Sequence, residues 1–194
     1  HFVFNGAYAL EIGALTPIFL AMEDRERILD LIESVTGGRF HPNFNRIGGV
    51  KPAAGSGPTT KKNVQDLPAG FYQETRDAME KVLEAVERME DLVGGNEVFK
   101  ARTKGVGIIS KELAEEYGVS GPILRASGVK FDLRTQTDFL PYDKFEYEIP
   151  VGENGDCYDR WYVRLLEMRE SAKIILQAID SMPSGPLQTK FQRL

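Results

Sequence analysis

The feature that most constrains the fold is a regular apolar stripe near the end of the chain. Its members step by four and three residues, which is the period of one face of an α-helix. They are Trp161, Leu165, Met168, Ala172, Ile175, Ile179 and Met182. Asp156 stands where an N-cap is expected, with Asp159 three residues later, and Pro183 closes the pattern. A helix with such a stripe must pack that face on other helices.

Three further stretches predict helices that supply those packing partners. Residues 1–12 have the pattern of a helix end. Thr16 and Pro17 begin a second amphipathic stretch, with the threonine hydroxyl as the expected cap, and Gly37-Gly38 ends it. A third stripe runs from about residue 70 to 93 and stops at a glycine pair.

The remaining segments predict shorter elements around this helical core. Ser110 is placed to cap a short helix, and the segment 120–150 is irregular, with Phe145–Ile149 as its best strand candidate because polar and apolar residues alternate. Residues 51–65 contain two prolines and almost no apolar side chains, which predicts a flexible insertion loop. We therefore expect a mainly α protein, with one helical core domain over residues 1–194.

Charge, cysteine content and hydropathy exclude several classes of function. The formal net charge is −5 and the positive residues are not massed in a patch, so a nucleic-acid partner is not expected. The only cysteine, Cys157, cannot form an internal disulfide, and it cannot hold an iron–sulfur cluster by itself. No apolar run reaches the roughly 18 to 20 residues of a membrane-spanning helix. The chain starts inside a helical pattern without methionine, which predicts a fragment of a longer subunit.

The stretch from Thr36 to Val50 concentrates the residues that are most capable of chemistry. It holds His41, the only histidine away from the chain terminus, together with Arg39, Arg46 and two Gly-Gly pairs. An imidazole titrates near neutral pH, so His41 is a candidate proton-exchanging group. From the residues alone, a loop histidine that caps a helix or meets solvent remains an alternative for His41. Arg46 could reach a carboxylate or a cluster sulfide, and a surface or structural ion pair is its alternative.

Two other polar positions stand out against their surroundings. Glu11 lies between apolar residues of the first helix, where a carboxylate is costly unless it is paired or solvated. It is a candidate proton carrier, and an edge-facing glutamate is the alternative. Cys157 lies among Asp156, Asp159 and Arg160, but helix capping explains both aspartates. We therefore interpret Cys157 as a packed small residue and not as a nucleophile.

A series of motifs, in order along nearly the whole chain, resembles one known family. These motifs are Leu10–Pro17, Thr36–His41, Arg46–Val50, Asp66–Phe71, Gly105–Gly107, Ser120–Val129, Asp132–Arg134, Gly155–Arg160 and Glu167–Ser171. They are similar to the D-type, quinone-chamber subunit of the proton-pumping NADH:quinone oxidoreductase, respiratory complex I. The resemblance implies a helical core of the kind found in [NiFe]-hydrogenase large subunits, and a place in the chamber where quinone is reduced.

The resemblance also implies roles for three residues. His41 matches the family histidine close to the terminal [4Fe–4S] cluster of a neighbouring iron–sulfur subunit, and Arg46 matches a cluster-proximal arginine of the same loop. Glu11 stands where the family usually has an aspartate that pairs with a quinone-headgroup histidine. The sequence departs from the family pattern at three places: Glu11 is a longer acid than aspartate, Pro42 follows the histidine, and an insertion follows Val50.

By this resemblance, the chain is part of a multi-subunit translocase and is inactive as an isolated fragment. It binds no cofactor or metal alone, its substrate is quinone, and the cluster belongs to its neighbour. The expected partners are the iron–sulfur subunit, other complex I subunits and the membrane arm. The expected location is peripheral, on the cytoplasmic side of a bacterial or archaeal cell membrane. A membrane-bound [NiFe] hydrogenase large subunit and a non-catalytic helical interaction module are the alternatives.

Overall fold

The computed structural model describes residues 1–51, 67–137, 140–183, 187 and 189. Its α-helices are α1 (Phe2–Glu11), α2 (Thr16–Thr36), α3 (Phe71–Met89), α4 (Glu97–Thr103), α5 (Lys111–Glu116), α6 (Gly121–Ala126) and α7 (Cys157–Asp180). A π-helical turn, η1 (Glu90–Gly94), continues α3, and two 3₁₀ turns follow α6, η2 (Leu133–Thr135) and η3 (Pro141–Lys144). The strands are β1 (Asn45–Arg46) and β2 (Gly49–Val50). The prediction of a mainly α protein is confirmed.

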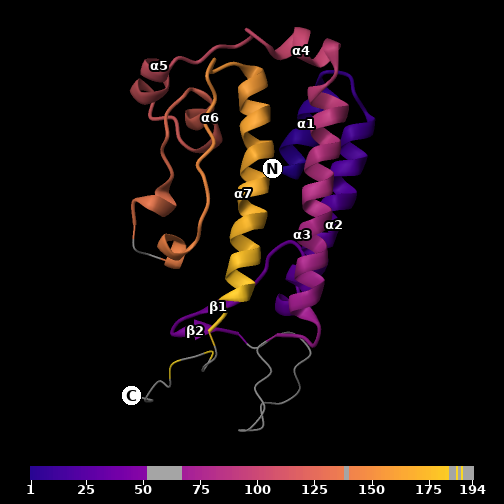
Figure 1. Ribbon diagram of the computed structural model, residues 1–194, viewed down its shortest axis with the longest axis vertical. Coiled ribbons are helices and arrows are strands. Elements are labelled where there is room, and N and C mark those ends of the chain that lie inside the picture. Colours follow the sequence, from indigo (N-terminus) through magenta and orange to yellow (C-terminus); the bar gives the residue numbers. More distant parts are fainter. Residues whose placement is uncertain (52–66, 138–139, 184–186, 188, 190–194) are drawn as a thin grey trace.

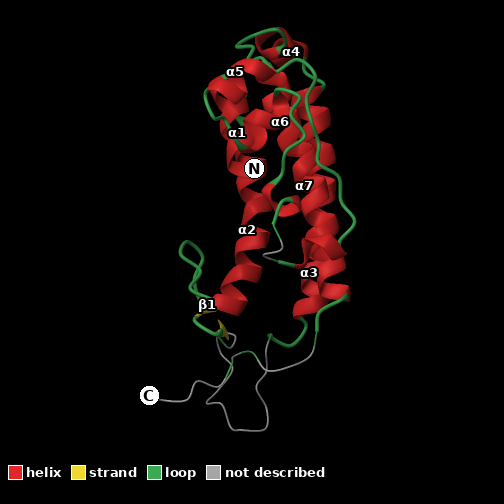
Figure 2. Cartoon of the chain, turned by 90° about the vertical axis from the view of Figure 1, so that its left-hand side faces the viewer, coloured by secondary structure: helices red, strands yellow, loops and turns green. Residues whose placement is uncertain are grey.

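The three long helices determine the shape of the molecule. α2, α3 and α7 run along its long axis, and α1 packs against both α2 and α7 (Figure 1). α6 packs on α7. Turned by 90°, the molecule remains elongated, with α4 and α5 at one end and the β-strands at the other (Figure 2). Glu11, at the end of α1, and the β-strands lie on opposite sides of α2 in the sequence, so this long helix separates them.

The predicted stripe of α7 forms the centre of the core. Trp161 and Leu165 have no exposed surface, and Met168 and Ala172 are also buried. They pack with α1 and with the buried face of α3, which consists of Thr75, Ala78, Met79, Val82, Ala85, Val86 and Met89. The period of the apolar residues therefore predicted both helices and most of their buried faces. The stripe was wrong at two positions, because Ile175 is exposed and Met182 lies beyond the end of α7 and is exposed as well.

Most of the predicted helix ends are confirmed. The Ser110 hydroxyl accepts a hydrogen bond from the Leu113 amide, and Asp156 accepts one from the amide of Asp159 at 2.9 Å. The cap predicted at Thr16 is wrong. Leu15 precedes the helix with helical torsion angles, so Thr16 is already the first helical residue and its side chain makes no capping hydrogen bond.

The strand predicted at Phe145–Ile149 is also wrong. The backbone there lies along α7 instead of beside another strand. The amide of Glu146 donates to the side-chain oxygen of Gln177 at 2.8 Å, and the amide of Glu148 donates to the Glu170 carboxylate at 2.9 Å. Helix side chains thus satisfy the alternate backbone groups that a neighbouring strand would otherwise pair.

Two predictions concern the limits of the described chain and its relation to a membrane. The insertion loop predicted at residues 51–65 lies outside the described residues, except for Lys51. Among the residues described, no helix has the length and apolar character required to cross a membrane.

The buried face of α7 supports a direct stability prediction. Replacing Leu165 by alanine should lower the free energy of unfolding by about 2–5 kcal/mol, because it removes a fully buried side chain and leaves a cavity. Urea unfolding followed by the fluorescence of Trp161, the only tryptophan, measures the change. Ile175→Ala is the control, because Ile175 lies on the same helix but is 37% exposed. Equal losses in the two variants would contradict the assigned core.

Candidate functional site

The candidate stretch begins where α2 ends. Gly37 adopts the left-handed conformation, with φ +77°, and its amide donates to the carbonyl of Glu33 at 2.7 Å. This conformation suits glycine and ends the helix. The Thr36 hydroxyl lies within hydrogen-bond distance of the carbonyls of Ile32 and Gly38. The chain therefore leaves α2 through a defined turn.

The stretch then forms a short β-hairpin, where the sequence predicted only a glycine-rich loop. Asn45 pairs with Val50 and Arg46 with Gly49, and Gly48 occupies the turn with φ +85°. The far edge of the hairpin is paired as well. The Val50 amide donates to the carbonyl of Leu187 at 3.0 Å, and the Thr189 amide donates to the carbonyl of Gly48 at 2.8 Å. Residues that follow α7 in the sequence thus hold the hairpin in place.

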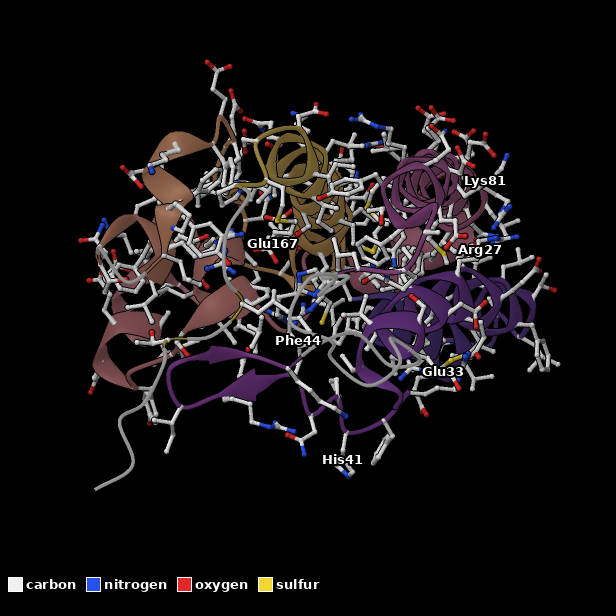
Figure 3. The ribbon with its side chains drawn as sticks, turned by 90° about the horizontal axis from the view of Figure 1, so that it is seen from below. Arg27, Glu33, His41, Phe44, Lys81 and Glu167 are labelled. Atoms are coloured by element: carbon white, nitrogen blue, oxygen red, sulfur yellow. The ribbon has the colours of Figure 1, made fainter. Side chains whose placement is uncertain are left out.

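The side chains of this stretch point outwards. His41 is exposed and extends away from the helical body (Figure 3). Its ring packs edge-to-face on Phe40, with the ring centroids 4.5 Å apart. Phe40 is 81% exposed and Ile47, at the hairpin turn, is 90% exposed. Two large apolar side chains and one imidazole therefore lie uncovered on the same projecting segment.

The two arginines of the stretch behave differently. Arg46 stays within the hairpin, where it donates to the side-chain oxygen of Asn43 and to the carbonyl of Asn45. Arg39 turns back onto α2 and forms ion pairs with three carboxylates, those of Glu26, Asp30 and Glu33. Its role was not predicted, although acidic residues at spacings of four and three preceding an arginine were a signal for it.

The structure does not bring Glu11 and His41 together. Glu11 is the last residue of α1 and its side chain is exposed, so within this chain it lacks the buried surroundings that the apolar pattern implied. The 21 residues of α2 separate the two positions. At 1.5 Å of rise per residue that helix is about 30 Å long. Any function of the two residues must therefore be exerted at two separate places.

Cys157 lies at the start of α7 in a polar network. The Arg160 guanidinium donates to its sulfur at 3.0 Å and to the carbonyls of Gly155 and Gly107 at 2.8 Å each. Tyr8 of α1 donates to the carbonyl of Cys157 at 3.4 Å, and burial raises the pKa of this phenol. The thiol is partly buried, and the contacts of this cluster tie α1 and the segment before α5 to α7.

A cavity with a volume of about 450 Å³ lies elsewhere, beside the 3₁₀ turns. Arg134 lies against the rings of Tyr142 and Tyr147, at 5.5 and 5.0 Å from their centroids. Its guanidinium donates to both oxygens of Asp132. These hydrogen bonds lower the pKa of the Asp132 carboxyl and raise that of Arg134. This ion pair holds the loop together and is a structural feature.

Metal ligands do not gather in the described part of the chain. Within residues 1–51, 67–137 and 140–183, the side chains of histidine, cysteine, aspartate and glutamate form no group of three that could hold a metal ion.

The fold and the site together define a class of protein: a mainly helical scaffold with His41 and Arg46 on a projecting segment after α2, and with Glu11 before the other end of that helix. Comparison of the sequence with known families gives the specific relationship. The chain belongs to the family described as respiratory-chain NADH dehydrogenase, 49 Kd subunit, whose sequence model matches residues 11–194. This finding confirms the family resemblance that the sequence motifs indicated.

Individual relatives agree with this family. The D-type NADH-quinone oxidoreductase subunit of Desulforamulus reducens is 44% identical over all 194 residues, which cover 50% of that relative. The Carboxydothermus hydrogenoformans protein of the same name is 43% identical over the same span. The C/D-type protein of Nitrosospira multiformis is 42% identical over 95% of this chain and 28% of the relative. The chain thus spans about half the length of these D-type relatives.

The ion pair at the cavity supports a prediction with a defined pH dependence. The pKa of Asp132 is lower in the folded protein than in the unfolded one, so its stabilising effect is present above the unfolded pKa and is lost as the pH falls through the folded pKa. Asp132→Asn should therefore lower the free energy of unfolding by about 1–2 kcal/mol at neutral pH. Urea titrations should show this difference shrinking below about pH 4.

The matched control is Asp143→Asn, because the exposed Asp143 lines the same cavity. Its effect on stability should be small at every pH. A deficit of Asp132→Asn that keeps its full size in acid would show that the carboxylate charge is not what stabilises the loop.

Proposed function

We propose that the chain is a core part of the quinone-binding subunit of an NADH:quinone oxidoreductase. In this role it helps to pass electrons from the [4Fe–4S] cluster of a neighbouring iron–sulfur subunit to quinone, with coupled proton translocation. The family membership supports this proposal, and the names of the relatives describe subunits of such an enzyme. The same family match favours this function over a [NiFe] hydrogenase large subunit and over a non-catalytic module.

The observation that carries the proposal is the exposed segment that runs from Phe40 through the hairpin. His41, Phe40 and Ile47 project from a body whose core is closely packed. Exposed apolar side chains on a projecting element are typical of a surface that associates with a partner. In the proposal, this surface faces the iron–sulfur subunit, with His41 at the edge of the cluster and Arg46 close to it.

The chemistry gives His41 a defined task. When a cluster next to an imidazole takes up an electron, the added negative charge favours the protonated imidazolium. Electron uptake is then linked to proton uptake, and the midpoint potential of the cluster depends on pH. The exposed ring of His41 is free to take this position when the partner is present.

Glu11 has a separate task in the proposal. Reduction of a quinone to a hydroquinone takes two electrons and two protons, so acidic groups on the path to the headgroup have a chemical role. Glu11 lies at the other end of α2 from the hairpin, beside the turn between α1 and α2. We place it on the proton path, paired with a headgroup histidine that belongs to another part of the complete subunit.

The proposal also assigns a place in the cell and in the complex. We infer that residues 1–194 form one helical core domain of a longer subunit. This subunit is peripheral and lies on the cytoplasmic side of the cell membrane, next to the membrane arm of the complex. A role that requires electron delivery by a neighbour means that the isolated chain has no activity.

The first test replaces His41 by methionine in the whole complex. A one-electron couple that is linked to one proton shifts by about 59 mV per pH unit. We expect His41→Met to remove most of the pH dependence of the terminal cluster's midpoint potential, measured by redox titration with electron paramagnetic resonance. Phe44→Leu, in the same hairpin region, is the control and should keep the slope. An unchanged slope in His41→Met would refute the role of His41.

The second test concerns Glu11. Glu11→Gln keeps the size of the side chain but cannot release a proton at neutral pH, so quinone reduction should slow by at least about tenfold. Reduction of the iron–sulfur clusters by NADH should be unchanged in the same preparation. Glu23→Gln, on the exposed side of α2, is the matched control. Normal quinone turnover in Glu11→Gln would remove this residue from the proton path.

A further inference from the structure

We call residues 38–50 the hairpin segment. Among the described ion pairs, those of Arg39 are the only ones that join the start of this segment to α2. One terminal nitrogen of its guanidinium lies 2.6 Å from carboxylate oxygens of both Asp30 and Glu33, and the other bonds Glu26. The arginine lies two positions before His41 in the sequence. The ion pairs of Arg39 therefore restrict the positions that His41 can adopt.

The three carboxylates form a ridge along the last turns of α2. Their spacings of four and three residues place them on one helix face, where like charges repel each other. The positive charge of Arg39 reduces this repulsion, and the hydrogen bonds that it donates to Asp30, Glu33 and Glu26 raise its pKa. The planar guanidinium has several donors in a fixed arrangement, so it holds a particular orientation that a lysine ammonium would not.

The other contacts of the segment hold its far end. The hairpin pairs with Leu187 and Thr189 through backbone hydrogen bonds, while the Lys51 amide bonds the carbonyl of Phe44. The Thr36 hydroxyl bonds the backbone of Gly38. From there to Pro42, the described ion pairs are those of Arg39 with α2, and the rings of Phe40 and His41 pack on each other. On the side towards α2, Arg39 therefore supplies the described ionic link that restrains the position of His41.

We propose that Arg39 is a positioning residue that holds His41 in place through its ion pairs with Glu26, Asp30 and Glu33. The proposal rests on the function given to His41 above. Arg39 does not touch the reacting groups in this role. It fixes the start of the segment to the rigid end of α2, so that the imidazole meets the cluster of the partner at a constant distance.

This role differs in its signature from a direct effect of the arginine charge. Loss of a nearby positive charge shifts a cluster's midpoint potential by a similar amount at every pH. Loss of positioning weakens the coupling between cluster and imidazole, so the potential changes less with pH. The change of the midpoint potential per pH unit (the slope) therefore reports positioning. A shift of the potential that is equal at every pH (the offset) reports charge.

The experiment measures the cluster's midpoint potential in the whole complex between about pH 6 and pH 8, where an imidazole titrates. Arg39→Gln should lower the pH slope by about half or more, and Arg39→Lys, which keeps the charge but not the planar guanidinium, should lie in between. The combined variant Glu26→Gln, Asp30→Asn and Glu33→Gln should lower the slope as well. Its offset should have the opposite sign to that of Arg39→Gln, because it removes negative charge.

Arg25→Gln is the matched control. Arg25 lies on α2 beside the ridge and its described ion pair is with Glu26, at 3.7 Å, so the slope should keep its wild-type value. Cluster content and the size of the assembled complex are measured for every variant. If Arg39→Gln does not assemble, Arg39→Lys and the carboxylate variant still decide, since the first keeps the positive charge and the second leaves Arg39 itself unchanged.

The outcomes separate this inference from the function on which it rests. Loss of slope in His41→Met together with wild-type slopes in the Arg39 and carboxylate variants overturns the positioning role alone. A wild-type slope in His41→Met overturns the function of His41 itself. Loss of slope in all of them, with opposite offsets for the arginine and carboxylate variants, supports both.

Discussion

The helical body depends on the burial of Trp161 between the helices. Its indole has no exposed surface and packs edge-to-face on Phe99 of α4, with ring centroids 4.9 Å apart. Gly94 allows the backbone to approach the ring closely, since a Cβ atom there would lie 3.2 Å from it. The chain forms a π-helical turn at this point, and Glu90 in that turn accepts hydrogen bonds from Tyr162 and Arg169 of α7. One aromatic ring thus sets the positions of α3, α4 and α7 relative to each other.

A rigid body of this kind gives a fixed spacing to what lies at its ends. Asp24, buried within α2, pairs with Arg27 of the same helix and with Arg88 of α3, so sliding of α2 along α3 would break the ion pair between the buried Asp24 and Arg88. Glu11 precedes one end of α2, and the hairpin follows the other. A scaffold that joins proton chemistry at one place to electron transfer at another has use for such a spacer, and this is how the structure fits the proposed function.

The sequence predicted well whatever depends on local periodicity and on helix caps. The stripe from Trp161 to Ile179, the caps at Ser110 and Asp156 and the glycine at the end of α2 all follow from interactions within a few residues. One local prediction failed, the cap at Thr16, because the helical turn already includes Leu15. The other failures involve partners that are distant in sequence. Residues 145–149 alternate like a strand but bond to α7, and the hairpin at Arg46 is completed by Leu187 and Thr189. Periodicity carries no information about such partners.

The candidate residues show the same division between local and distant causes. Glu11 lies in an apolar pattern that left both burial and an edge-facing position open, and the structure shows it exposed at the end of its helix. Arg39 has the sequence context of an ordinary loop arginine, and its three partners precede it by six to thirteen residues. Exposed ion pairs of this kind contribute little to stability in water. When a partner protein covers such ion pairs, water is excluded and the charges interact more strongly, so under the proposed positioning role the ion pairs of Arg39 would strengthen as the complex assembles.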